Sequence, residues 1–233
     1  MAATSIASPE HEPILPLESG DCLGADEFMR RYEAMPHVKK AELIEGTVYM
    51  GSPVSAMHAV PDTIFRGWLF VYAARTPGTE ATGNFTVRLG PRNIPQPDSL
   101  LRILPEFGGQ THLDPEGYLL GPPELVVEVA ASSAAIDLHA KLRVYRRAGV
   151  REYLVWRPLA REFDWFVLHQ NEYRPNAPAS SGVFRSPHFQ GLALSMDALL
   201  KNDSTKVLDV LQANLQTPAH RAFVARRAAK AGK

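Results

Sequence analysis

The pattern of apolar and polar residues predicts one deeply buried strand near the middle of the chain. The segment 124–130, ELVVEVA, is almost entirely apolar, which is typical of a strand inside a sheet. The segment from about 135 to 148 then repeats apolar residues at helical spacing, and Gly149 follows it as a common helix terminator. The sequence therefore predicts a buried strand followed by a helix.

Weaker patterns surround this pair. A helical pattern opens at Asp26, and 43–50 has the composition of a strand in which Gly46 marks a turn or bulge. Pro61 suits the start of a helix that continues through Tyr72. Further strands are expected at 86–89, 98–104, 153–156 and 165–168, a short helix at 196–200, a surface loop at 105–123 and irregular chain at 171–187. This order predicts an α/β or α+β domain with a central mixed β-sheet flanked by helices.

The ends of the chain differ from its middle. Residues 1–23 are rich in Ser, Pro and acidic residues and predict a flexible leader, followed by a folded domain over 24–201. Residues 202–233 predict a helical, basic tail with Arg221, Arg226, Arg227, Lys230 and Lys233. This tail could be a DNA-contacting arm, but a solvated terminal helix is the favoured interpretation.

Composition limits the classes of function. The chain has 233 residues, 45% of them hydrophobic, and 25 basic against 25 acidic residues, so nucleic acid could be attracted only by a local patch. Cys22 is the sole cysteine, which excludes an intramolecular disulfide and a cysteine-based zinc cluster. No secretory signal and no apolar span of membrane length is present, so we expect a cytoplasmic protein without a membrane partner.

Glu128 stands in the middle of the predicted buried strand. Strand side chains alternate between faces, so Glu128 shares a face with Val126 and Ala130, opposite Val127 and Val129. A carboxylate among these residues costs free energy unless a cation or hydrogen-bond donors satisfy it. The simpler alternative is a strand with one solvated face, and the spacing does not decide between the two.

Lys141 lies on the apolar side of the following helix. Leu138, Lys141, Leu142 and Tyr145 are spaced i, i+3, i+4 and i+7 and form one stripe that should face the sheet. The lysine could simply cover apolar surface with its stem, or it could hold its ammonium group beside Glu128. Asp137, one turn earlier, is expected to pair with Lys141 or to cap the helix.

Asp98 is a candidate partner for Glu128. It follows Pro97, which favours an extended approach, and it opens an apolar segment that could return to the neighbouring strand. An aspartate in such a place can also be an ordinary turn residue. Two carboxylates converging from adjacent strands would form a hard-oxygen site suited to Mg²⁺ or Mn²⁺.

The sequence resembles the PD-(D/E)XK nuclease superfamily in its Pro97-Asp98 pair, Glu128 and subsequent lysine. It is closer still to the bacterial Uma-type family of restriction-endonuclease-like proteins, over about residues 25–201. The similar segments are AELIEGTVYMGSPVSAMH, PELVVEVAASS, the run that holds Asp137, Lys141, Tyr145, Gly149, Val150, Glu152 and Tyr153, and GLALSMDALL.

The resemblance implies a restriction-endonuclease-like core and a set of roles. Asp98 and Glu128 would hold Mg²⁺ or Mn²⁺, and Lys141 would orient or activate the attacking water and stabilise negative charge. The superfamily usually places its lysine two residues after the glutamate, where this chain has Ala130, but the family branch supplies it from the next helix. Glu42 would be a further metal ligand, with Glu45 as the competing choice.

The resemblance also implies a role for His58 near the metal, whose alternative is a helix-capping or loop histidine. Pro61 and Arg157 depart from the family's pattern. The implied function is a metal-dependent endonuclease that hydrolyses DNA, and a homodimer is the expected assembly because many nucleases of this superfamily work as dimers. The alternative is a nuclease fold that no longer cleaves and binds DNA or a protein partner.

Overall fold

A six-stranded mixed sheet forms the centre of the computed structural model, which describes residues 13–231. In spatial order its strands are β11 (Glu172–Pro175), β10 (Glu162–His169), β9 (Glu152–Arg157), β8 (Leu125–Val129), β5 (Ser99–Ile103) and β3 (Thr79–Thr82). Strands β8 and β9 are parallel, whereas the other neighbours are antiparallel. The predicted mixed sheet is confirmed.

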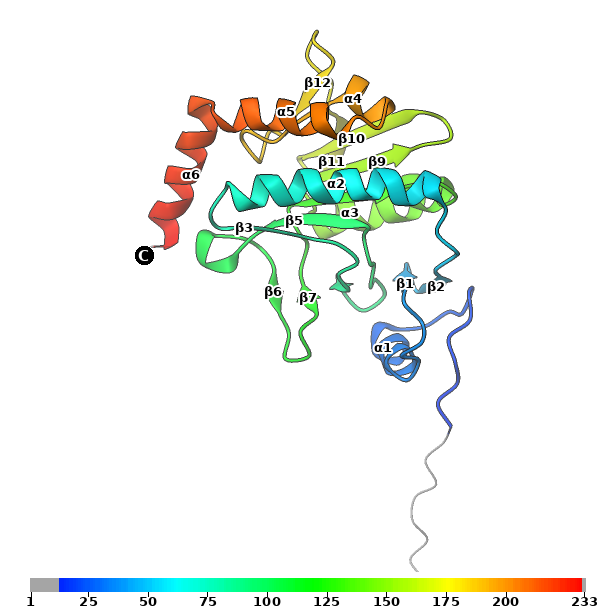
Figure 1. Ribbon diagram of the computed structural model, residues 1–233. Helices are drawn as coiled ribbons and strands as arrows, with labels where there is room; N and C mark the ends of the chain where they lie inside the picture. Colours follow the sequence, from blue (N-terminus) through cyan, green and yellow to red (C-terminus); the bar gives the residue numbers. More distant parts are fainter. Residues whose placement is uncertain (1–12, 232–233) are drawn as a thin grey trace, which may run out of the picture.

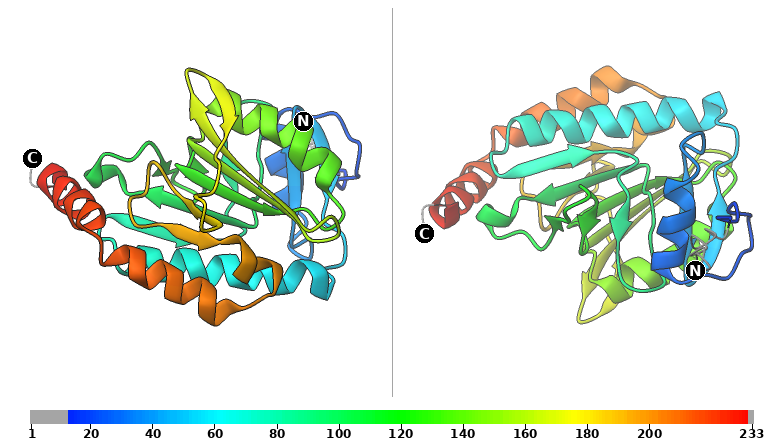
Figure 2. Two further views of the ribbon diagram at one scale, coloured as in Figure 1. Left: turned by 90° about the horizontal axis from the view of Figure 1, so that it is seen from above. Right: turned by 90° about the horizontal axis from the view of Figure 1, so that it is seen from below.

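Helices cover both faces of this sheet (Figures 1 and 2). One face carries α2 (Ala56–Ala74), α4 (Met196–Leu200) and α5 (Ser204–Leu215). The other face carries a single π-helical segment (Ile136–Lys141) that continues into α3 (Leu142–Ala148). The chain between β8 and β9 therefore crosses the sheet as a strand–helix–strand unit, as the sequence predicts.

Smaller elements stand at the two ends of the sheet (Figure 2). At one end lie α1 (Ala25–Glu33) and the hairpin of β1 (Ala41–Ile44) and β2 (Thr47–Met50); at the other lies α6 (Pro218–Ala231). The remaining elements are β4 (Val87–Arg88), a 3₁₀ turn (Pro105–Phe107), β6 (His112–Leu113), β7 (Leu119–Leu120), β12 (Val183–Arg185) and β13 (Ala193–Ser195). No helix in residues 13–231 is long and apolar enough to cross a membrane.

Strand β8 is buried on both faces. Val127 and Val129 pack with the α2 side, while Val126 and Ala130 pack with the α3 side. The alternative of a strand with one solvated face is therefore wrong, and Glu128 is only 2% exposed. Its carboxylate must find its partners inside the protein.

Several predicted boundaries need correction. Helix α2 begins at Ala56 rather than at Pro61, and Pro61 lies inside it, where it removes one backbone hydrogen bond without ending the helix. The single strand expected over 43–50 is a hairpin, in which Glu45 and Gly46 both take positive φ angles of 52° and 84°. Such a two-residue turn reverses the chain and separates the side chains of Glu42 and Glu45.

Short strands occupy segments that were expected to be irregular. The expected loop 105–123 contains β6 and β7, and 171–187 contains β11 and β12. Strand β3 was not predicted at all, because TEAT has no apolar alternation and forms only an edge strand. These pieces are shaped by pairing with neighbours rather than by their own composition.

The expected leader and tail both belong partly to the folded body. Residues 1–12 lie outside the described part, but in 13–23 Leu17 is buried and Leu23 N donates to Gly46 O at 2.8 Å. At the other end, Val207, Leu211 and Leu215 of α5 are buried in the main core. Their i, i+4, i+8 spacing is the signal that the prediction of a tail from residue 202 overlooked.

Glu152 is a fully buried carboxylate that fastens β9 to its surroundings. It accepts hydrogen bonds from Trp165 Nε1 at 2.7 Å, from His188 N at 3.1 Å, and from Ser186 Oγ. One side chain thus joins the centre of the sheet to the segment that leads into β13.

We expect Glu152→Ala to lower the free energy of unfolding by about 3 kcal/mol or more, because it leaves several buried donors without an acceptor. Urea denaturation followed by circular dichroism measures this loss. Glu172→Ala is the control, since that side chain is 70% exposed and its removal should change stability by less than about 0.5 kcal/mol. Equal effects of the two substitutions would contradict the assigned role.

Candidate functional site

Five charged side chains gather at the end of the sheet where β5 begins. They come from five separate segments, which the fold brings together: Glu42 in β1, His58 in the first turn of α2, Asp98 just before β5, Glu128 in β8 and Lys141 at the end of the π-helical segment. All five residues for which the sequence and the resemblance implied a role therefore lie in one place.

Lys141 is the centre of this cluster. Its Nζ lies 2.9 Å from Glu128 Oε1, 2.9 Å from Glu42 Oε2 and 3.6 Å from Asp137 Oδ1. The Lys141 side chain is only 4% exposed, so these contacts replace water almost completely. The helical stripe correctly predicts that Lys141 faces the sheet. Of the two expected roles for Asp137, pairing with Lys141 is the one found, at 3.6 Å.

The hairpin turn decides which glutamate points inward. Glu42 contacts Lys141 and also accepts a hydrogen bond from Gln96 N at 2.7 Å. Glu45 sits in the turn and pairs with Arg143 and Arg147 on the outer surface of α3. The alternative that Glu45 lies in the cluster is therefore excluded by its position.

Asp98 is held from three directions. Its Oδ2 accepts from Val129 N at 2.9 Å, while its Oδ1 lies 2.8 Å from Lys40 Nζ and 3.6 Å from His58 Nε2. Burial opposes its charge, but the contacts with His58 and Lys40 still hold the pKa of the Asp98 carboxyl below its usual range. Asp98 therefore stays ionised.

His58 bridges the sheet and the carboxylate. Its Nδ1 lies 2.9 Å from Val129 O and its Nε2 faces Asp98, so both ring nitrogens meet acceptors. The contact with Asp98 raises the pKa of His58, although burial opposes the shift. The position in the first turn of α2 is not that of a helix cap, since Ser55 occupies the N-cap.

Glu128 is the carboxylate of the cluster whose charge burial opposes most clearly. Its Oε1 accepts from Tyr145 OH at 2.9 Å in addition to Lys141. Burial raises the pKa of Glu128 to about 8; Asp98 and the other nearby carboxylates add to the rise, and Lys141 opposes it. The site therefore holds more carboxyl groups than its lysines balance, and burial favours the protonated form of Glu128 unless a further cation offsets its charge.

Asp137 adds to that excess. Burial raises the pKa of Asp137 as well, and its Oδ1 is buried without a hydrogen-bond partner among the described residues. Its Oδ2 accepts from Ser133 Oγ. The π-helical segment from Ile136 to Lys141 carries both Asp137 and Lys141 on its buried side. Such widened turns often occur at functional sites.

The donor set fits a divalent cation in its chemistry. Four carboxylates, from Glu42, Asp98, Glu128 and Asp137, face two ammonium groups, and Asp137 Oδ1 has no hydrogen-bond partner among residues 13–231 beyond its longer ion pair with Lys141. Carboxylate oxygens are the ligands that Mg²⁺ and Mn²⁺ prefer. As the side chains lie, however, no group of three or more His, Cys, Asp or Glu residues within 13–231 is arranged to hold an ion. Lys40 already occupies Asp98 Oδ1.

Comparisons with known proteins give the family and the fold of this chain. A family model described as "Putative restriction endonuclease" (Uma2) matches residues 25–197. The chain belongs to this family. A crystal structure from Anabaena variabilis, described as a putative nuclease, is similar with a TM-score of 0.62 and 15% identity, covering 77% of this chain and 98% of that one. At that identity the likeness shows the fold. No curated protein matches significantly.

The sequence prediction missed Lys40, although the Uma2 match covers it. The alternation of strand residues offered the signal, because Lys40 and Glu42 are two residues apart and point to the same face. Tyr145 was part of the inward stripe, but its bond to Glu128 was not foreseen. Arg157, which departs from the family's pattern, pairs with Glu162 and Asp164 away from the cluster.

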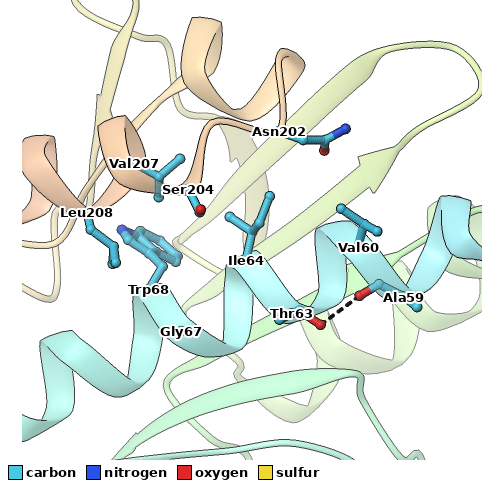
Figure 3. A pocket seen from close by; sticks show the side chains of 10 residues that line it. All are labelled: Ala59, Val60, Thr63, Ile64, Gly67, Trp68, Asn202, Ser204, Val207 and Leu208. Atoms are coloured by element: carbon cyan, nitrogen blue, oxygen red, sulfur yellow. Dashed lines mark hydrogen bonds between the residues drawn. The ribbon is translucent and has the colours of Figure 1, made fainter.

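The two described grooves lie beside the cluster rather than at it. One, between α2 and α5, has a volume of about 380 Å³ and is lined mainly by apolar side chains such as Ile64, Trp68 and Leu208 (Figure 3). The other, between α2 and β3, has a volume of about 410 Å³. None of the five clustered residues lines either groove.

Replacing Lys141 by Met should destabilise the Uma2-family fold by about 3–5 kcal/mol, because it leaves the buried carboxylates of Glu128 and Glu42 without their cation. Chemical denaturation at pH 7 measures the loss. Adding Glu128→Gln should recover part of it, whereas Lys201→Met, at a 64% exposed surface site, should have almost no effect. A fully stable Lys141→Met protein would show that the ammonium group does not balance the cluster.

Proposed function

We propose that this protein is a divalent-metal-dependent nuclease that hydrolyses phosphodiester bonds in DNA. The observation that carries the proposal is the excess of buried carboxylates around Lys141, in a chain of the Uma2 family. Buried carboxylates are costly unless a positive charge balances them, and their oxygens suit Mg²⁺ or Mn²⁺. Cleavage of DNA is inferred from the family's description as restriction endonucleases.

Asp98, Glu128 and Glu42 are the residues that would hold the metal. When bound, such an ion polarises a phosphoryl oxygen and lowers the pKa of a coordinated water. Asp98 and Glu128 come from adjacent strands of a rigid sheet, so their carboxylates are fixed before any substrate arrives. Asp137, the fourth carboxylate, keeps Lys141 oriented from its own helix.

Lys141 contributes a fixed positive charge. Its Nζ is already held between Glu128 and Glu42, so the charge needs no rearrangement when negative charge develops on a phosphate. His58 and Lys40 are more exposed, with side-chain exposures of 23% and 29%, and they border the cluster toward solvent. We infer that a substrate phosphate approaches along these two residues.

A competing function is a nuclease-fold module that binds DNA or a protein partner without cleaving. One observation favours it: Lys40 and His58 already balance Asp98, and the carboxylates as placed do not form a complete ion site. Metal binding separates the two proposals, because the module has no need of a divalent ion.

Purified protein with Mg²⁺ or Mn²⁺ should cleave DNA, and Asp98→Asn or Glu128→Gln should lower the rate by at least about 100-fold, the usual cost of losing one electrostatic contact in such a site. Gel-based assays on single-stranded, duplex and supercoiled DNA measure it.

Glu42→Gln and Glu45→Gln form a matched pair, because both glutamates lie on one hairpin and only Glu42 contacts Lys141. We expect Glu42→Gln to lower the rate and Glu45→Gln to leave it within about two-fold. Cleavage that persists in Asp98→Asn or Glu128→Gln would rule out this site.

Lys40→Met should tighten the binding of Mg²⁺ or Mn²⁺ by about ten-fold or more, since it removes the ammonium group that competes for Asp98 Oδ1. Isothermal titration calorimetry with the metal salt alone, without DNA, measures the affinity. Lys39→Met is the control, because the neighbouring lysine is exposed and its Nζ donates to Pro36 O at 3.4 Å rather than to a carboxylate of the cluster. Failure of both proteins to bind a divalent ion at millimolar concentration would favour the non-cleaving module.

A further inference from the structure

The groove between α2 and β3, here the α2–β3 groove, runs beside the start of β5. Its floor includes Ser99, the residue next to Asp98, and its walls include Arg66 and Phe70 of α2 and Thr82 and Gly83 at the end of β3. The groove therefore lies next to the backbone that carries Asp98, although the Asp98 side chain does not line it.

Arg66 is positioned at the mouth of this groove. Its Nε donates to Asp62 Oδ2 at 2.8 Å, a contact that fixes the guanidinium in one orientation. A side chain at Gly83 would collide with that guanidinium and with the backbone oxygen of Asp98. Because Gly83 has no side chain, the Arg66 guanidinium can occupy this space and lie close to the backbone of Asp98.

Ser99 offers an unused hydrogen-bonding group in the floor of the groove. It is 1% exposed, and its Oγ has no partner among the described residues. Strand β3 ends opposite Leu100, so the sheet does not cover Ser99 on that side. A buried hydroxyl without a partner at a groove floor indicates that a ligand can supply one.

Phe70 is an aromatic side chain left in solvent. It is 66% exposed, although it lies on α2 between buried Leu69 and partly buried Val71. An exposed aromatic ring beside a guanidinium and a hydroxyl is the combination that binds unpaired nucleotides, since the ring stacks on a base and the cation meets a phosphate. An exposed apolar residue on its own would carry no functional meaning, so it is the neighbouring Arg66 and Ser99 that make Phe70 significant.

The groove between α2 and α5 lacks this combination. The residues that line it include no charged side chain, and none of its polar groups is buried without a partner (Figure 3). Nothing there specifies a ligand. Both grooves have volumes in the range of about 300–1,000 Å³ that is usual for ligand sites. Only the α2–β3 groove of the two also has the charged, aromatic and hydroxyl groups that could recognise a ligand.

We propose that the α2–β3 groove holds one nucleotide of an unpaired nucleic-acid strand, with its phosphate on Arg66 and its base against Phe70. This inference rests on the proposed function, because it makes the groove the path by which a strand reaches Asp98. Ser99 Oγ supplies a hydrogen bond to the sugar or base. The substrate class is thereby narrowed to DNA that is single-stranded, frayed or flapped near the cleaved bond.

The test measures binding apart from cleavage. Fluorescence anisotropy measures the affinity for a labelled oligo-dT of about twelve nucleotides and for a duplex of equal length. EDTA is present so that no divalent ion supports cleavage. Arg66→Ala and Phe70→Ala should each weaken binding of the single strand by about 5- to 100-fold, the range expected for losing one stacking or charged contact. Phe70→Tyr should retain affinity within about two-fold, because it keeps the aromatic face.

Matched controls are Leu159→Ala, which removes a side chain that is 70% exposed, and Arg174→Ala on the exposed strand β11. Neither should change binding by more than about two-fold. Thermal melting of every variant checks that it folds; Phe70 is exposed, so its replacement should leave the midpoint nearly unchanged.

Each outcome decides the inference. Unchanged affinity in Arg66→Ala and Phe70→Ala overturns it, and if the parent protein still cleaves DNA, the proposed function stands without it. Weaker binding in those variants, in a parent that cleaves nothing with any divalent metal, supports the groove while the nuclease proposal fails. If the variants lose affinity for the single strand and for the duplex equally, the groove does not select an unpaired nucleotide, and this part of the inference is wrong. A concentration-dependent dimer that Phe70→Ala abolishes, with no effect on DNA, assigns the groove to a second copy instead.

Discussion

The ammonium group of Lys141 is the interaction on which the rest of the site depends. It lies between carboxylates from three elements, the hairpin, strand β8 and its own π-helical segment. Without it, these carboxylates would repel one another in a region almost free of water. Because Lys141 contacts all three elements, it holds them in fixed relative positions. The same contacts therefore pack the hairpin against the sheet and set the geometry of the site.

The carboxylates of the cluster outnumber its lysines, and this imbalance is what suits the site to a cation. Two lysines and a histidine balance part of the carboxylate charge, and Lys40 does so from a position that is partly open to solvent. Lys141 is enclosed and belongs to the permanent framework, whereas Lys40 can exchange its contact for water. The cluster thus combines one enclosed cation with one that is partly open to solvent.

The sequence predicted the parts of this structure that rest on periodic burial. The composition of ELVVEVA predicted a strand, and the stripe through Leu138, Lys141 and Tyr145 predicted which side of the helix faces it. The spacing left open whether Glu128 is buried, and the packing on both faces of β8 decides that. The position of Asp98 came mainly from the resemblance to a family, since one aspartate after a proline is common in turns. The two-residue spacing of Lys40 and Glu42 indicates only a shared face, whereas the contact of Lys40 with Asp98 and the groove beside Arg66 depend on how distant segments fold together.

The hydrogen bond from Val129 N to Asp98 Oδ2 has a consequence for how this protein can change over evolution. The last residue pair between β5 and β8 joins Ser99 to Val127, and the side chain of Asp98 then takes the place of a backbone acceptor one step further on. Asp98 therefore completes the sheet as well as facing the cluster. Selection for stability would retain this aspartate even in a descendant that had lost all hydrolytic activity. The presence of Asp98 in a relative is evidence for an intact sheet, and activity there has to be judged from residues with no such structural duty.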